Sequence, residues 1–403
     1  MRGASNHLTP GERVRYYRKR RGLSQQILAD RTGRSLSWVE KIESGRMALA
    51  AYAAVDALAL ALDVSRGDLM PDDVADVDRQ SHGRSVPALR KLVMSYRFVN
   101  PRFYEEDVAP LALPALKAAV ADLWSAYQES RYPYVVAQMH RTLPRAYATA
   151  RIETGRNRNE ARIQLAYLYQ VSASVLAKIG EVDLAFVCAD RGESTLGDLE
   201  HPVARTSISR SVAHTLTAHG QYDDAVAVAE QAIAEVRVAP TQPQLISTVG
   251  SLHLVAAVAA ARSSNRSDAR SHLQAAAILA GRLATDANHL FTAFGPTNVE
   301  IHTVAVAGEL GDFETAAHIG PGVDVSAMPV ERQVRHRLEV ARALHHRGRR
   351  DQALDLVIQA ERIAEEQVRR HVLTHGLVSE WVKTAHKRPS RELDGLARRI
   401  GVL

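Results

Sequence analysis

The sequence predicts an all-α protein in two parts: a small helical unit over residues 9–70 and stacked helical hairpins over residues 87–403. In the second part Val, Leu and Ala recur at spacings of three and four, and short breaks rich in Gly, Asn, Pro and Asp separate the runs. Five of these breaks share a pattern of Gly or Asn, then polar residues, then Ala. The five alanines lie 40, 44, 47 and 37 residues apart and are Ala185, Ala225, Ala269, Ala316 and Ala353. A helical period of about 40 residues is typical of an α-solenoid.

The composition is that of a globular protein. The chain has 403 residues, of which 46% are hydrophobic and 24% charged. Its one cysteine, Cys188, excludes an intrachain disulfide and a Cys-based zinc site, as expected in a reducing cytoplasm. Neither a signal-peptide pattern nor an uninterrupted apolar segment of about 20 residues is present. We therefore expect a soluble cytoplasmic protein without a membrane partner.

The positive charge is concentrated at one end. Residues 1–70 hold 12 Lys/Arg and 7 Asp/Glu, whereas residues 71–403 hold 39 and 38. The net charge of +6 is thus almost entirely in the first part, which indicates a polyanion-binding head on a balanced body. Residues 71–86 are acidic and weakly apolar, and are expected to form a linker between a 1–70 domain and an 87–403 domain.

Ser and Thr residues mark helix starts in the head. Thr9 and Glu12 are spaced as a capping box, while Ser24 and Ser35 stand where further helices begin. Gly22 and Gly33 are expected to end helices. The five predicted helices span about residues 10–21, 25–31, 36–44, 52–62 and 66–69.

Residues 23–45 match what a helix needs in order to read B-DNA. Such a helix must enter the major groove, be braced by a second helix, and point polar side chains at base edges. Ala29 is small where two helices would cross, and Gly33 lies in the tight turn between them. Val39 and Ile42 face inward, which leaves Ser35, Ser37, Trp38 and Lys41 on the outer face.

These residues resemble the phage-repressor-type, or XRE-like, helix-turn-helix family. The resemblance covers residues 9–70 and is carried by Leu23-Ser24-Gln25, Thr32-Gly33 and Ile42-Glu43-Ser44-Gly45. It implies a repressor-like domain in which Gln25 contacts phosphate. It also implies that Leu36, Ser37 and Lys41 read bases, and that Arg18 and Glu43 form a structural ion pair. Ser35 caps the recognition helix and is expected to contact phosphate or a base. Trp38 either packs against the sugar–phosphate backbone or extends the core.

One recognition helix contacts few base pairs. Each good base contact discriminates by about 1–3 kcal/mol, whereas selection of a genomic site needs about 4–10 kcal/mol. We therefore expect a homodimer, joined through the helical body, on a pseudo-palindromic site in double-stranded DNA.

The body is similar to the tetratricopeptide-like (TPR-like) regions of actinomycete transcriptional regulators with the same domain order. Segments 123–132 and 294–302 carry the resemblance, together with the period and the turns. It implies a sequence-specific DNA-binding transcriptional regulator whose body senses a ligand and dimerises. A related architecture in peptide-pheromone receptors holds a peptide on its concave face through Asn side chains. Asn298 is the corresponding candidate here, with Phe294 and His302 nearby. The alternative is that Asn298 bonds backbone where a helix restarts at Gly295-Pro296-Thr297.

No catalytic pattern appears in the sequence, which lacks a phosphate-binding Gly-Lys loop, a His-Glu-x-x-His pair and a Gly-x-Ser-x-Gly elbow. We therefore expect neither an enzyme nor a bound cofactor or metal. His371 and His375, four residues apart on one predicted helix, are the pair whose spacing would best suit a metal ion. Two functions remain for the body. It senses a peptide or small molecule, or it is a protein-interaction scaffold without a small ligand.

Overall fold

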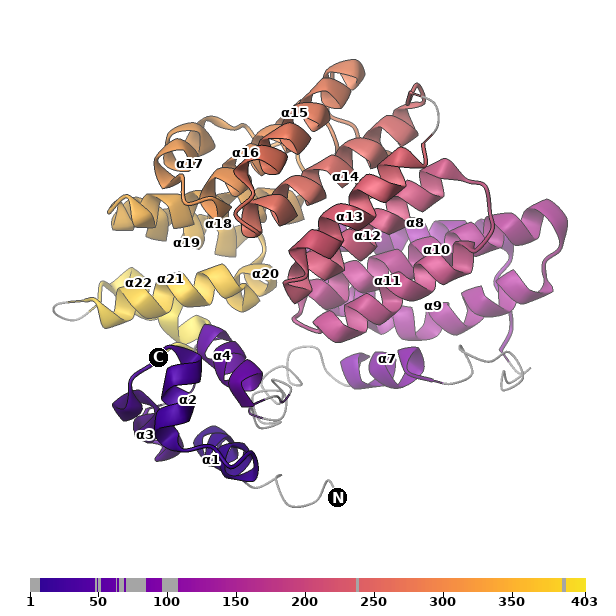
Figure 1. Cartoon of the computed structure of the whole chain (residues 1–403). Coiled ribbons are helices and arrows are strands. Elements are labelled where there is room, and N and C mark those ends of the chain that lie inside the picture. Colours follow the sequence, from indigo (N-terminus) through magenta and orange to yellow (C-terminus); the bar gives the residue numbers. More distant parts are fainter. Residues whose placement is uncertain are drawn as a thin grey trace. The chain divides into compact units, whose positions relative to one another are not determined.

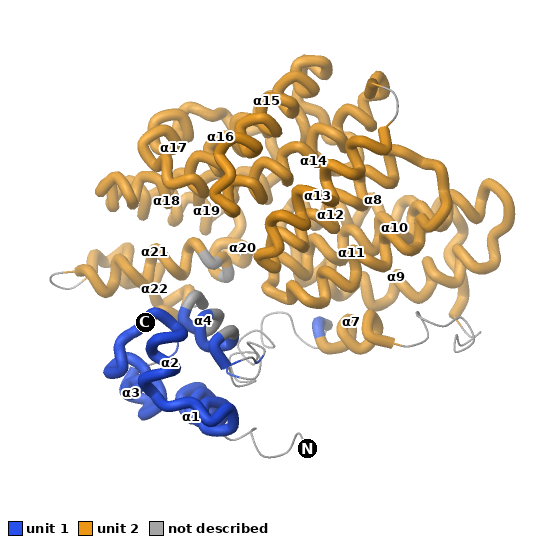
Figure 2. The backbone as a smooth tube through the Cα atoms, in the orientation of Figure 1, with its two compact units in different colours: residues 1–86 blue, residues 87–403 orange. Residues whose placement is uncertain are grey.

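The computed structural model describes residues 8–47, 49, 52–62, 64, 69, 85–95, 108–236, 239–385 and 389–403. The chain divides into two compact units, residues 1–86 and 87–403 (Figure 2). Every element in the described part is a helix, apart from one isolated bridge between Ala287 and Phe294. The predicted all-α class is therefore confirmed.

The N-terminal unit contains the first four predicted helices: α1 (Pro10–Arg20), α2 (Gln25–Thr32), α3 (Leu36–Glu43) and α4 (Tyr52–Leu62). The Thr9–Glu12 capping box is formed at α1, and the hydroxyls of Ser24 and Ser35 cap α2 and α3 as predicted. Gly33 ends α2 in the left-handed conformation. The core of this unit gathers the apolar residues Val14, Leu28, Val39, Ile42, Leu58 and Leu62.

Two predicted segments fall largely outside the described residues. The fifth head helix, 66–69, is described only at Leu69, and the acidic linker, 71–86, only at Ser85 and Val86. These last two residues already belong to α7 (Ser85–Val93).

The C-terminal unit is a series of helices joined in pairs by short turns (Figure 1). The six pairs are α8 (Leu113–Gln128) with α9 (Tyr132–Ile152), α10 (Gly155–Lys178) with α11 (Val182–Leu196), α12 (Pro202–His219) with α13 (Tyr222–Ala234), α14 (Pro243–Arg262) with α15 (Arg266–Leu283), α16 (Pro296–Glu309) with α17 (Phe313–Ile319), and α18 (Val330–His346) with α19 (Arg350–Ile363). Short 3-10 helices η3 (His289–Phe291) and η4 (Gly320–Gly322) follow α15 and α17, and α20 (Glu365–Arg370), α21 (Val372–Lys383) and α22 (Arg391–Arg399) end the unit.

The five repeated breaks are the turns of five of these hairpins. Four contain a glycine with positive φ, for example 86° at Gly180 and 81° at Gly220. The alanine that follows each turn is at most 1% exposed, because it packs where the second helix crosses close to its partner. The predicted helical hairpins are therefore confirmed.

The first helices of the pairs form an inner layer. Along the chain, α8, α10, α12, α14, α16 and α18 each contact the next one, and α18 also contacts α8. The inner layer therefore returns on itself and encloses an interior. Within it, α14 is long and apolar enough by composition to cross a membrane, but 72% of its apolar window is buried in the unit. Packing in the core accounts for its composition.

Candidate DNA interface and interior cavity

Helix α3 presents one exposed face and one buried face. Val39 and Ile42 are at most 2% exposed and lie in the core. The predicted contact residues Ser35, Leu36, Ser37 and Lys41 are all exposed. Leu36 leaves 37% of its surface exposed to solvent. The outer face of α3 is therefore free to meet a partner.

Close packing against α1 fixes the angle of α3. Gly11 lies against the C-terminal turn of α3, so that a Cβ atom at this position would stand 2.1 Å from the carbonyl oxygen of Ile42. Only glycine permits this approach without a shift of one helix. The contact holds α3 against the rest of the unit at the end opposite Ser35.

A buried ion pair ties the three helices together. Arg18 donates from Nε to Glu43 Oε1 at 2.5 Å and from Nη2 to Glu43 Oε2 at 2.8 Å, and its Nη1 donates to the carbonyl of Leu23. The bidentate bond with Glu43 raises the pKa of Arg18 further above its ordinary value. The amide of Gln25 donates to Glu43 Oε2 at 2.9 Å. The pair that the resemblance implied is present, and it orients Gln25 at the start of α2.

Trp38 is half-buried, and it packs against the core of the unit. The guanidinium of Arg34 lies 5.5 Å from the centre of its ring, an arrangement typical of a cation–π contact. Of the basic run 13–21, Arg13 and Arg18 are buried, and the side chain of Arg21 donates to the carbonyl of Leu62. The exposed cations of α1 are Arg15, Lys19 and Arg20.

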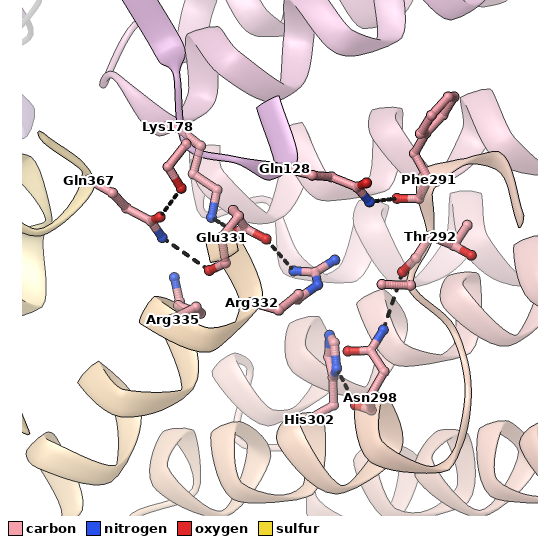
Figure 3. A network of polar contacts seen from close by, with 12 residues as sticks. Gln128, Lys178, Phe291, Thr292, Asn298, His302, Glu331, Arg332, Arg335 and Gln367 are labelled. Atoms are coloured by element: carbon pink, nitrogen blue, oxygen red, sulfur yellow. Dashed lines mark hydrogen bonds and ion pairs between the residues drawn. The ribbon is translucent and has the colours of Figure 1, made fainter. Parts of the chain in front are cut away.

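The C-terminal unit contains a polar space that we call the interior cavity. It has a volume of about 40 Å³. Side chains from α8, α10, α12, η3 and α18 line it, so that segments far apart in sequence meet there (Figure 3). Its lining comprises Trp124, Tyr127, Gln128, Ser174, Lys178, Arg210, Ser211, His214, Phe291, Pro329, Glu331 and Arg332.

Glu331 is the centre of a charged network in this cavity. Its carboxylate pairs with Lys178 and lies 3.4 Å from Arg332, while its backbone carbonyl accepts from Gln367 at 3.2 Å (Figure 3). Burial alone would raise the pKa of Glu331, but Lys178 and Arg332 hold it below its ordinary value. Gln367 in turn accepts from Ser130 at 2.7 Å. The network links α10 to α18 and to α20.

Arg210 faces the same cavity from α12. Arg210 is 91% buried. Its Nε and Nη2 atoms have no hydrogen-bond partner among the described residues. Burial and the neighbouring Arg332 lower the pKa of Arg210 to about 10, so it remains a cation at pH 7.

The segment between α15 and α16 closes one side of the cavity in a strained conformation. Four of the six non-glycine residues with positive φ in the described part of the chain fall here: Ala284, Leu290, Phe291 and Ala293. The ring of Phe291 stacks on Trp124 with centroids 5.3 Å apart. Gln128 donates to the carbonyl of Phe291 at 3.1 Å and exchanges hydrogen bonds with Asn288. Segment 123–132, which carried part of the family resemblance of the body, thus contacts residues 288–291, just before the second such segment.

The three predicted ligand residues have different surroundings. Asn298 is 1% exposed and donates to the Thr292 carbonyl at 3.4 Å, while its Oδ1 has no partner among the described residues. Burial and Arg332 lower the pKa of His302 to about 3, so the ring is neutral and Nδ1 donates to the Asn298 carbonyl at 2.8 Å (Figure 3). Phe294 is fully buried in the core, with its ring over Gly250. Asn298 and His302 are therefore together, and Phe294 is a packing residue in this structure.

The histidine pair considered for a metal is engaged with protein atoms. His371 caps α21 by accepting from the backbone of Leu373, and His375 bonds the carbonyl of Arg369. In the part of the chain that the structure describes, no three His, Cys, Asp or Glu side chains are grouped as metal ligands.

Sequence reasoning missed the charged lining of the cavity. Lys178 and Glu331 are 153 residues apart, so no local spacing could connect them. The available signal was α12, whose buried positions include Thr206, Ser207 and Arg210 rather than only apolar residues. A helix that is buried on most sides and still polar indicates a polar interior.

Comparison with known proteins agrees with the geometry of the head. Residues 11–71 match the family model of a helix-turn-helix domain, so the N-terminal unit is a helix-turn-helix domain. No curated protein matches the sequence significantly. A solved structure of Bacillus thuringiensis PlcR in complex with the peptide PapR7 and DNA aligns with 80% of this chain and 97% of its own, at 12% identity and a TM-score of 0.36. A similarity this weak supports no conclusion about what this chain binds.

Proposed function

We propose that this helix-turn-helix regulator binds double-stranded DNA through the outer face of α3, as a cytoplasmic homodimer on a pseudo-palindromic operator. We propose further that its TPR-like body binds a peptide or small-molecule effector and that the protein acts by binding rather than by catalysis. The observation that carries the proposal is the exposed face of α3, which is supported from behind by Gly11 and by the Arg18–Glu43 pair.

The side chains on that face suit base and phosphate recognition. Ser37 and Lys41 are one turn apart, and both can donate hydrogen bonds to base edges or to phosphate. Leu36 can contact a thymine methyl group. Gln25, oriented by Glu43, uses one amide hydrogen in that bond and has a second to donate to a phosphate.

The interior cavity favours a sensing body over a plain scaffold. It collects buried polar atoms without partners among the described residues, on Arg210 and nearby on Asn298, and such atoms are costly unless something binds them. A ligand there would touch α8, α10, α12 and α18 together. Differential binding to two arrangements of these helices would shift the equilibrium between them and so alter DNA affinity.

Selection of bound sequences from random duplex DNA tests the proposal. The full-length protein should enrich a site with two related half-sites whose centres are about 10 base pairs apart, or a multiple of that spacing, with two chains bound per site. An enriched site with a single half-site and one chain contradicts the dimer. Failure to enrich any sequence contradicts the DNA-binding function itself.

A further inference from the structure

We propose that the interior cavity binds an anionic group of its ligand, a carboxylate or a phosphate, and that Arg210 is the residue that recognises it. The inference rests on the proposed function only in that the body binds a ligand. It adds the chemical class of that ligand and the side chain that selects it.

The first argument is the cost of an unpartnered buried cation. Arg210 is 91% buried, and its Nε and Nη2 atoms have no hydrogen-bond partner among the described residues. A buried charge is rarely tolerated unless it is paired and hydrogen-bonded. A guanidinium offers planar, paired donors that match carboxylate and phosphate oxygens. Arg210 therefore lacks hydrogen-bond acceptors, and the oxygens of a bound anion would supply them.

The second argument is the charge of the lining. Lys178, Arg210 and Arg332 contribute three positive charges, whereas Glu331 contributes the only negative charge of this lining. Glu331 forms its ion pairs with Lys178 and Arg332, and its charge raises the pKa of Arg210 less than burial and Arg332 lower it. His302, which stands beside the network, is neutral. The lining carries an excess of two positive charges, which one bound anion reduces or cancels.

The third argument concerns the sizes and linings of the interior cavity and of the groove beside it. The cavity of about 40 Å³ exceeds the room that one water needs and suits a small charged group. A wider groove of about 400 Å³ adjoins it and shares Gln128 and Pro329 with it. The charged residues that line this groove are acidic, Glu129 and Asp286. The ligand is therefore expected to place its anion in the cavity and a neutral or cationic remainder in the groove.

The experiment titrates the full-length protein with defined probes by calorimetry at constant ionic strength. The probes are inorganic phosphate, acetate, and trialanine with either a free or an amidated carboxyl end. We expect wild type to bind phosphate, or acetate and free trialanine, and not to bind amidated trialanine. Phosphate binding alone identifies a phosphate group, and binding of acetate and free trialanine identifies a carboxylate.

The Arg210→Gln variant should lose at least about tenfold in affinity for the same probe, the usual result of removing a charged hydrogen-bond partner. Arg210→Lys keeps the positive charge but loses the paired donors of the guanidinium, so it should bind the probe with intermediate affinity. The matched control is Arg282→Gln, on the exposed surface of α15, which should bind as wild type does. Without probes, the melting temperature of Arg210→Gln should not fall below that of wild type, because an unpaired buried charge is removed.

The inference is overturned if no probe binds wild type, or if Arg210→Gln binds as tightly as wild type does. DNA affinity measured on the same samples separates this result from the proposed function. Anion binding without any change in DNA affinity leaves the site standing and contradicts the sensing role. Specific DNA binding without any anion binding leaves the DNA-binding role standing and contradicts the site.

Discussion

Gly250 shows how a single atom controls packing in the body. A Cβ atom at this position in α14 would lie 2.0 Å from the ring of Phe294. We expect Gly250→Ala to lower the free energy of unfolding by about 1–3 kcal/mol, since the ring has to move within a filled core. The measurement is urea unfolding followed by circular dichroism.

Gly281 provides the matched control for this change. It also lies within a helix, α15, but nothing surrounds the position of its missing Cβ within 4 Å. Gly281→Ala should therefore raise the free energy of unfolding, by up to about 1 kcal/mol, through helix propensity alone. Equal effects of the two substitutions would show that Phe294 is not packed on Gly250.

The pKa of His302 predicts a dependence of stability on pH. Burial and Arg332 lower it to about 3, well below its ordinary value of 6.5. The stability that depends on neutral His302 is therefore complete above about pH 6.5 and is lost as the pH falls toward 3. We expect His302→Gln to reduce the slope of unfolding free energy against pH between 6.5 and 4, by up to about 1.4 kcal/mol per unit. Exposed His140→Gln should leave that slope unchanged.

At the scale of elements, the orientation of α3 depends on Glu43. Its carboxylate is 3% exposed and accepts from both Arg18 and Gln25. Glu43→Gln leaves the Arg18 charge buried without its partner, which should destabilise the N-terminal unit by about 3–5 kcal/mol. Hydrogen exchange of the α3 amides measures this locally. Replacing both members, as in Arg18→Met with Glu43→Leu, should cost less than Glu43→Gln alone, and an equal or larger cost contradicts the role of the pair.

Helices and turns were predictable from the sequence where residues within or next to them determine where they begin and end. The caps Thr9, Ser24 and Ser35 and the glycine turns act within a few residues, so the sequence predicts most of the helices and five of the hairpins. The α8–α9 hairpin escaped because its turn has Ser130, with φ of 62°, where four of the predicted turns have glycine, and Val135 where all five have alanine. Asn288 and Gln128 could not be paired from sequence, because 160 residues separate them.

At the scale of the whole molecule, the two units differ in how much of them could be predicted from the sequence. The face of α3 follows from a pattern within 23 residues, which predicts the exposure of Ser35, Ser37 and Lys41, whereas Trp38, predicted on the same face, is half-buried. The interior cavity exists only after α18 has returned to α8, and its charged lining follows from that closure. Phe294 illustrates the difference, since its place in the sequence suggested a ligand contact and the fold places it in the core.

The most direct test of the account replaces Ser37 and Lys41 by alanine and measures affinity for the selected operator and for a scrambled duplex. Arg282→Ala, which removes one exposed positive charge from the body, is the control. The account predicts that the double variant loses at least about tenfold in operator affinity, and most of its preference over the scrambled duplex, while its circular dichroism spectrum is unchanged. Unchanged affinity and unchanged preference in the folded double variant would contradict the claim that α3 reads DNA.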